Sequence, residues 1–314
     1  MRVVSIPANP VPDKIVTGMI KAPDGVELRF ARFEPPAGRR GTVCIFTGRT
    51  EWTEKYFETV RDLRSRGFAV AILDWRGQGL STRALKDPRK GHVGNFAEYE
   101  LDLETFMREI VLPDCPPPIF ALAHSMGAAV LLRAAYRGHR WFDRIVLTAP
   151  MIALGQINRM APAAAILRGM RLAGLGGRYV PGRYRGVMDL RPFAGNILTT
   201  DPVRFARNAA ILDAEPGLGL GGPTVAWCDA AFRIMRLLRE PSFPSQIRQP
   251  ILIVGAGRDA IVSNTAIEDF ATLLRAGSHL VVVGAQHEIL MEQDRYRSQF
   301  WAAFDAFVPG SPLF

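Results

Sequence analysis

A serine, an aspartate and a histidine each follow a strand-like apolar run in this sequence. Ser125 lies in Ala-His-Ser-Met-Gly at 123–127, between the apolar run 119–123 and the small-residue helical pattern 127–136. A serine at such a junction sits on a sharp turn with its hydroxyl above the sheet, as in the nucleophile elbow G-x-S-x-G. Ala123 replaces the first glycine and is still small enough for the crowded position. The pattern predicts Ser125 as a nucleophile, against the alternative of a chance serine at a strand–helix junction.

A serine hydroxyl is a weak nucleophile, so it needs a base, and the base needs an orienting acid. In sites built on a nucleophile elbow the chain order is serine, then acid, then histidine. Asp259 follows the apolar run 251–254, and His287 follows the run 280–283. Because the carboxyl ends of parallel strands meet at one edge of a sheet, both side chains are expected beside Ser125. We therefore predict His287 as the base and Asp259 as its acid, with Asp229 as the alternative acid.

The other four histidines have weaker claims to the role of base. His124 neighbours the nucleophile, but its side chain points elsewhere if Ser125 is presented. His139 is expected at the surface. His279 is expected to precede its strand, at the opposite end of the sheet. His92 lies in a loop and is predicted to line the substrate pocket.

An oxyanion that develops on an attacked carbonyl needs backbone N–H donors. The amide of Met126, the residue after the nucleophile, is one predicted donor. The second is expected from the loop 46–50, where Gly48 lets the backbone turn its amides inward. We assign the N–H of Arg49, while a neighbouring amide remains the alternative. The glycine-spaced turn at 74–81 lacks the lysine of a phosphate loop, so we interpret it as a structural turn beneath the site.

Strand and helix patterns alternate along most of the chain. After a hairpin at 15–20 and 26–33, strands are predicted at 42–46, 68–73, 119–123, 144–148, 251–254 and 280–283. Helical patterns cover 54–66, 97–110, 127–136, 264–275 and 295–307. This order predicts an α/β fold with a mostly parallel, twisted sheet and helices on both faces. The core is expected over 1–150 and 244–314, and 151–243 is expected as an inserted helical lid.

Composition limits the class of protein. The 314 residues are 48% hydrophobic and 22% charged, as in an ordinary globular protein. The three cysteines have no CxxC spacing, which argues against a disulfide framework and against a zinc site. The first residues carry no apolar stretch of secretory length, so a cytoplasmic location is expected. The net charge of +9 indicates an anionic partner, but no nucleic-acid-binding motif accompanies it.

Taken together, several segments resemble the α/β-hydrolase superfamily, and within it the bacterial lysophospholipase L2 and monoacylglycerol lipase group. The segments are Thr-Gly-Arg-Thr-Glu at 47–51, Asp-Trp-Arg-Gly-Gln-Gly at 74–79, Lys-Gly-His-Val at 90–93, Ala-His-Ser-Met-Gly at 123–127 and His-Glu-Ile-Leu at 287–290. The Gly-Arg-x-Glu form at 48–51 is similar to lysophospholipase L2 rather than to the His-Gly form of monoacylglycerol lipases. The resemblance implies a serine esterase with no metal or organic cofactor, whose triad is Ser125, Asp259 and His287.

The resemblance implies a fatty-acyl ester as substrate, with a lysophospholipid first and a monoacylglycerol or general carboxylic ester as the alternative. His92, Met151 and Ile152 are the expected substrate-binding residues. Residues 151–240 hold 12 Arg and 6 acids, so this segment carries +6 of the net charge. Arginines interleaved with apolar residues are typical of a segment that contacts an anionic membrane surface. The equally weighted alternative is that the apolar residues cover the core while the arginines are solvated.

Overall fold

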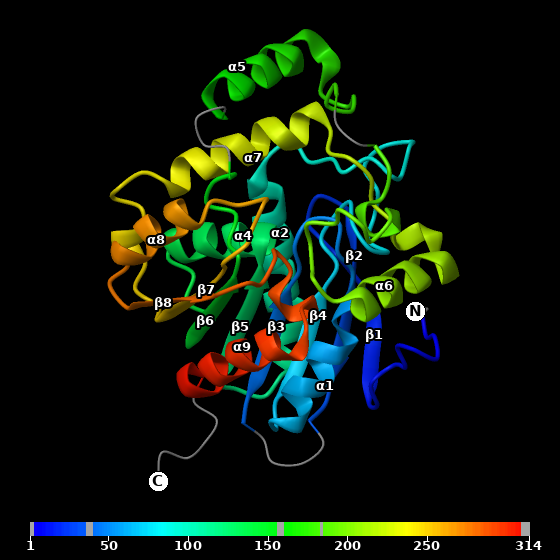
Figure 1. The fold of residues 1–314 in the computed structure, drawn as a ribbon, viewed down its shortest axis with the longest axis vertical. Helices are drawn as coiled ribbons and strands as arrows, with labels where there is room; N and C mark the ends of the chain where they lie inside the picture. The colour runs from blue at the N-terminus through cyan, green and yellow to red at the C-terminus, as the bar shows by residue number, and fades with distance from the viewer. Residues whose placement is uncertain (1–2, 36–39, 156–159, 183–184, 309–314) are drawn as a thin grey trace.

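The fold is an eight-stranded sheet with helices on both faces (Figure 1). The structure, a computed structural model, describes residues 3–35, 40–155, 160–182 and 185–308. The strand order is β1-β2-β4-β3-β5-β6-β7-β8. The strands are β1 (Ile15–Lys21), β2 (Glu27–Phe33), β3 (Thr42–Phe46), β4 (Ala69–Leu73), β5 (Ile119–His124), β6 (Arg144–Thr148), β7 (Ile251–Ala256) and β8 (Gly277–Val282). The pairs β1–β2 and β2–β4 are antiparallel, and all the others are parallel.

Alternate strand residues face two separate apolar cores. One face packs against α2 (Phe96–Phe106), α4 (Ser125–Tyr136) and α8 (Asn264–Thr272). The opposite face packs against α1 (Phe57–Ser65) and α9 (Asp294–Phe307). Since the central parallel strands are buried on both faces, their sequences are continuous apolar runs rather than alternating ones. The predicted α/β class, with its mostly parallel sheet between two helical layers, is confirmed.

The segment between β6 and β7 is mainly helical and lies over the carboxyl end of the sheet (Figure 1). Its elements are α5 (Met160–Met170), a π-helical turn η4 (Arg171–Leu175), the 3-10 turns η5 (Met188–Leu190), η6 (Pro216–Leu218) and η7 (Pro244–Gln246), and the helices α6 (Pro202–Ala214) and α7 (Val225–Leu238). We call residues 160–175 the α5 arm and residues 188–218 the α6 arm. The shorter elements of the rest of the chain are η1 (Thr53–Tyr56), η2 (Met107–Val111), α3 (Leu112–Asp114) and η8 (Ile289–Met291).

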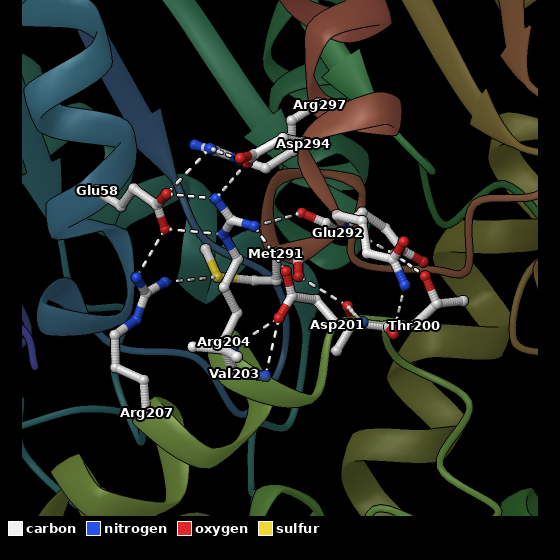
Figure 2. A network of polar contacts seen from close by, with 12 residues as sticks. Glu58, Thr200, Asp201, Val203, Arg204, Arg207, Met291, Glu292, Asp294 and Arg297 are labelled. Atoms are coloured by element: carbon white, nitrogen blue, oxygen red, sulfur yellow. Dashed lines mark hydrogen bonds and ion pairs between the residues drawn. The ribbon is translucent and has the colours of Figure 1, made fainter.

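The two arms are attached to the molecule in different ways. Helix α7 packs on α2 and α4, and the α5 arm packs on α7 as the outermost layer (Figure 1). The α6 arm reaches the core itself, through a network of ion pairs with α1 and α9 (Figure 2). No helix of the described ranges combines the length and the apolar character needed to cross a membrane.

The largest difference between an expected and an observed strand boundary is at β8. Strand β8 begins at Gly277, three residues before the predicted run 280–283. His279 therefore lies inside the strand, paired in register with Ile253, and does not precede it. The error arose because Gly-Ser-His is a weak strand sequence, and pairing with the buried neighbour β7 overrode that local preference.

Candidate active site

The turn from β5 into α4 presents Ser125. Its φ is 48°, in the left-handed region that side chains rarely adopt, as expected for a strained turn that exposes a hydroxyl. A Cβ at Gly127 would lie 2.5 Å from the carbonyl oxygen of Phe46, so only glycine fits there. Ala123 is buried within the strand and tolerates its methyl group, which explains why this position need not be glycine.

His287 and Asp259 extend a hydrogen-bonded chain from this hydroxyl. The Nε2 atom of His287 lies 3.1 Å from Oγ of Ser125, and its Nδ1 lies 2.7 Å from Oδ2 of Asp259. The other carboxylate oxygen of Asp259 accepts the amides of Ile261 and Val262 at 2.8 and 2.9 Å. Burial opposes ionisation, but His287 and these two amides hold the pKa of Asp259 below its usual value. The carboxylate is thus fixed in its charged form beside the imidazole.

The alternative acid has a different environment. Asp229 lies on α7, where its Oδ2 pairs with Arg171 at 2.6 Å and with Arg233 at 3.2 Å. The pair with Arg171 joins η4 to α7, and the pair with Arg233 lies within α7. The structure therefore brings Asp259, and not Asp229, into hydrogen-bonding contact with His287.

The loop after β3 contains a backbone amide that makes no hydrogen bond within the described residues. The N–H of Gly48 donates to Glu51, and the N–H of Thr50 donates to the side-chain oxygen of Gln78 at 3.0 Å. Within the described chain, the N–H of Arg49 between them donates to no protein acceptor. Of the three neighbouring amides, that of Arg49 is therefore the one available to an oxyanion. Met126 lies in the first turn of α4, directly after Ser125, where backbone N–H groups have no intrahelical partner.

The turn after β4 supports this loop. Gln78 also donates to the carbonyl oxygen of Gly48 at 3.0 Å, so one side chain holds both sides of Arg49. Asp74 accepts from Arg29 at 2.6 Å and from the amide of Thr53 at 2.9 Å. These contacts are structural, in line with the interpretation of 74–81 as a turn beneath the site.

A buried polar cluster beneath the site was not foreseen. Lys55 Nζ lies 2.7 Å from Glu288, 3.2 Å from Asp189 and 3.5 Å from Glu51. Burial, together with the like charges of Asp189 and Glu51, raises the pKa of Glu288 to about 7. The sequence signals were the spacing of four between Glu51 and Lys55, and the position of Glu288 directly after His287.

His124 fills the space between this cluster and the predicted base. Its ring centroid lies 4.8 Å from that of His287, and its Nδ1 lies 3.1 Å from the carbonyl oxygen of Thr148. Burial lowers the pKa of His124 to about 4, so the ring is neutral near pH 7. A neutral ring adds no positive charge beside His287, which must itself become protonated if it acts as a base.

The remaining predicted contacts lie around the same edge. His92 is half-buried, with Nδ1 3.0 Å from the hydroxyl of Thr224 at the start of α7. The amide of Met151 donates to the carbonyl oxygen of Ser125 at 3.1 Å. The side chains of Met151 and Ile152 are buried in the apolar core. Their contact with substrate stays a prediction.

One group of possible metal ligands occurs at the far side of α2. Glu100, Glu104 and His139 could place three ligand atoms close together. However, Glu100 is paired with Arg133 at 2.8 Å and with Arg137 at 3.3 Å. These guanidinium groups already balance its charge, so the group is a partly buried ion-pair cluster.

Comparisons of sequence identify relatives of this chain. The family model described as serine aminopeptidase, S33 (Hydrolase_4), matches residues 37–294. Lysophospholipase L2 of Escherichia coli strain K12 is 36% identical over 284 residues, which are 88% of this chain and 82% of the relative. A probable lysophospholipase L2 of Haemophilus influenzae is 29% identical over 88% of this chain and 86% of the relative.

Solved structures share the fold. A carboxyl esterase of Bacillus coagulans in complex with glycerol superposes with a TM-score of 0.76 at 17% identity, over 95% of this chain and 99% of its own. A soluble variant of monoglyceride lipase from Saccharomyces cerevisiae, in complex with a substrate analogue, gives 0.72 at 18% identity, over 93% and 96%. Because both sequence identities are low, these structures are evidence for the fold alone.

Proposed function

The chain belongs to the Hydrolase_4 family of serine hydrolases, as its motifs predicted, and we propose that it cleaves fatty-acyl esters of lysophospholipids through an acyl-enzyme on Ser125. The α/β-hydrolase fold and the class of ester hydrolase follow from that membership. The observation that carries the catalytic assignment is the hydrogen-bonded chain from Ser125 through His287 to Asp259.

In the acylation step, Oγ of Ser125 attacks the carbonyl carbon of the ester while Nε2 of His287 takes the hydroxyl proton. The amides of Arg49 and Met126 stabilise the oxyanion that forms. The bond to the glycerol oxygen then breaks, and the imidazolium of His287 protonates that leaving oxygen. Asp259 holds the ring in the tautomer this requires, with its proton on Nδ1, and stabilises the imidazolium.

In the deacylation step, water attacks the carbonyl carbon of the acyl-enzyme and gives a proton to His287. The bond between the acyl group and Oγ breaks, the fatty acid leaves, and His287 returns the proton to Ser125. The hydroxyl of Ser125, the ring of His287 and the carboxylate of Asp259 already form one hydrogen-bonded chain. The proposed cycle uses no metal or organic cofactor.

Two observations support a lysophospholipid as the substrate. The relatives of Escherichia coli and Haemophilus influenzae carry the name lysophospholipase L2, and 82% or more of their length is matched. The inserted segment is rich in arginine, which suits an anionic head group or membrane. The alternative is a monoacylglycerol lipase or general carboxylesterase, in which those arginines are only solvated.

We further propose a cytoplasmic enzyme that contacts anionic membrane peripherally through the α5 arm. Ile166 and Leu172 on this arm are 65% and 79% exposed, whereas Leu167 is buried. Arg168 and Arg178 beside them are exposed. Exposed apolar side chains flanked by arginine are the composition that binds an anionic interface. Arg159 and Arg183 of the same segment lie outside the described residues.

The test compares a lysophospholipid and a monoacylglycerol that carry the same short acyl chain, so that both stay monomeric. Ser125→Ala supplies the blank, and we expect it to lower kcat for both esters by roughly 10⁴-fold or more. For the wild type we expect kcat/KM to favour the lysophospholipid by about tenfold. Equal or better turnover of the monoacylglycerol would favour the alternative, and full activity of Ser125→Ala would remove the nucleophile assignment.

A further inference from the structure

The side chain of Arg49 occupies an unusual position beside the predicted oxyanion amide. It extends from the loop after β3 to the inserted segment, where Nη2 donates to the carbonyl oxygen of Gly221 at 2.6 Å. Its guanidinium lies over the ring of Trp227 on α7, 5.1 Å from the centroid. A Cβ at Gly91 would come within 2.5 Å of Nη2, so the absence of a side chain there makes room for the group.

This guanidinium has fewer partners than its charge demands. In the part of the chain that the structure describes, no carboxylate pairs with Arg49, and Gly221 is its one hydrogen-bond acceptor. Its Nε is buried without an acceptor. Burial lowers the pKa of Arg49, and the groups that act against this are Cys228, Tyr99 and Tyr179, none of them a carboxylate. Arginine stays protonated even so, because its ordinary pKa is very high.

Arg83 shows how the same chain uses an arginine for structure alone. It also crosses from the core to the inserted segment without a carboxylate in hydrogen-bonding contact. Its guanidinium donates to the carbonyl oxygens of Gly77, Gly79 and Gly217, at 2.6, 2.8 and 2.7 Å. Carbonyls therefore satisfy Arg83 on several sides. Arg49 keeps both partial exposure and open donors, which is the state expected of a group that binds an anion from outside the protein.

We propose that the guanidinium of Arg49 binds the phosphate of the substrate head group while its backbone N–H faces the oxyanion. The proposal rests on the proposed function, since it places a lysophospholipid in that site. In a 1-acyl lysophospholipid the carbonyl carbon and the phosphorus are separated by as many covalent bonds as separate the backbone nitrogen and the guanidinium carbon of an arginine. One residue can thus hold both ends of the glycerol unit.

This arrangement would let the site select a lysophospholipid over a neutral monoacylglycerol. The N–H groups of Arg49 that have no acceptor in the protein can donate to phosphate oxygens, which a neutral glycerol lacks. Trp227 stacks against one face of the guanidinium and restricts its orientation. A monoacylglycerol gives this guanidinium no anionic partner, so the site should favour the lysophospholipid over it.

The first experiment measures the ratio of kcat/KM for the short-chain lysophospholipid to that for the matched monoacylglycerol. Arg49→Gln should lower this ratio by about 10- to 100-fold. The variant loses the charge-assisted hydrogen bonds to the phosphate, and only the lysophospholipid carries that phosphate. The matched control is Arg233→Gln, since Arg233 also crosses from α7 to a core carbonyl, that of Gly94, at 2.7 Å. The control should leave the ratio unchanged. If Arg49→Gln lowered kcat/KM equally for both substrates, the side chain of Arg49 would have only a structural role and the proposal would be wrong.

The second experiment uses the wild type and needs no lysophospholipid as substrate. We expect sn-glycerol 3-phosphate to inhibit hydrolysis of the neutral ester competitively, and inorganic phosphate at the same ionic strength to inhibit less. Arg49→Lys, which keeps the charge but loses the fork, should weaken this inhibition several-fold. Equal inhibition of wild type and variant, or inhibition by inorganic phosphate alone, would overturn the head-group assignment. Failure of the proposed function would instead appear as ester turnover that survives Ser125→Ala.

Discussion

The two arms of the inserted segment both carry arginine, but they are attached to the molecule differently. In the α6 arm, Arg204 and Arg207 both pair with Glu58 of α1, at 2.5 and 2.7 Å (Figure 2). Arg297 of α9 reaches the same carboxylate at 3.0 Å. In the α5 arm, the ion pair between Arg171 and Asp229, at 2.6 Å, joins one part of the inserted segment to another. Arginine therefore fixes the first arm to the core, but not the second.

This difference separates two roles that the net charge of the whole inserted segment does not distinguish. In the α6 arm the charges of Arg204 and Arg207 are neutralised by carboxylates of the protein, as is that of Lys55 beside Asp189 under the site. On the α5 arm, Arg168 is exposed beside the exposed apolar residues Ile166 and Leu172. We infer that the α6 arm keeps the catalytic edge in place, while the α5 arm is the part available to a membrane.

The largest effect on stability is expected at the ion-pair cluster that Glu58 forms with three arginines, which we call the Glu58 clamp. Glu58→Gln would leave Arg204, Arg207 and Arg297 without the carboxylate that they share. Removing one partner of a largely buried ion-pair network costs about 3 to 5 kcal/mol. The free energy of unfolding in urea should fall by this amount, and digestion by a protease should begin within 188–218.

The matched control for this clamp is an exposed ion pair on the same face of the sheet. Arg66 pairs with Asp305 at 2.7 Å, and that carboxylate is half exposed. Asp305→Asn should change the free energy of unfolding by less than about 0.5 kcal/mol, because surface pairs contribute little. A loss at Glu58 no larger than this would mean that the α6 arm is held by apolar packing instead.

The pH dependence of stability gives a second test of the clamp. Burial alone would raise the pKa of Glu58, but Arg204, Arg297 and Arg207 lower it from 4.5 to about 2. Because the folded state holds this proton less tightly, the stabilisation is complete above pH 4.5 and is lost as pH falls toward 2. The difference in unfolding free energy between wild type and Glu58→Gln should therefore shrink over that interval. A difference independent of pH would contradict the assigned charge state.

The contrast also explains what could be predicted from the sequence. Asp259 and His287 follow two consecutive strand-like runs, and Ser125 lies at a strand–helix junction. This local pattern and the chain order were enough to predict all three side chains at one edge of the sheet. The local sequence is less informative at β8, because its pattern predicts a strand that starts after His279. The strand's start depends on pairing with β7, which no short window of sequence contains.

The side chains that hold the arms and the site could not be foreseen for the same reason. Glu58 meets Arg204 across 146 positions of the chain. Lys55 meets Glu288 across 233 positions. Arg49 was selected for its backbone amide, while the position of its side chain depends on Gly221 and Trp227 of the inserted segment. Such partners are determined by the folded arrangement and leave no periodicity in the sequence.

A smaller effect is expected from the ion pair of the α5 arm. Arg171→Gln removes one partner of Asp229, but Arg233 remains 3.2 Å from the same carboxylate. The loss of unfolding free energy should be about 1 kcal/mol or less, since Arg171 is partly exposed. Hydrogen exchange should become faster in α5 and η4 and stay unchanged in α6. Equal acceleration in both arms would show that they open as one unit. It would contradict the inference that only the α6 arm is fixed to the core.

The smallest effect on stability, and the sharpest test of function, is expected at the exposed apolar residues. Ile166→Ser combined with Leu172→Ser removes side chains that contact mainly solvent, so the free energy of unfolding should stay within about 0.5 kcal/mol of the wild type. Binding to vesicles rich in anionic lipid should weaken by roughly 10-fold or more, because each side chain would bury its apolar surface in the membrane.

Val203→Ser is the matched control, because Val203 is 75% exposed but lies on the α6 arm. Its vesicle binding should equal that of the wild type. Neutral vesicles should bind all three proteins weakly, since the arginines of the α5 arm then have no anionic partner. If Val203→Ser weakened binding as much as the double variant, both arms would face the membrane. The exposed residues of the α5 arm would then lose their special role, although the clamp at Glu58 would still set how the α6 arm is held.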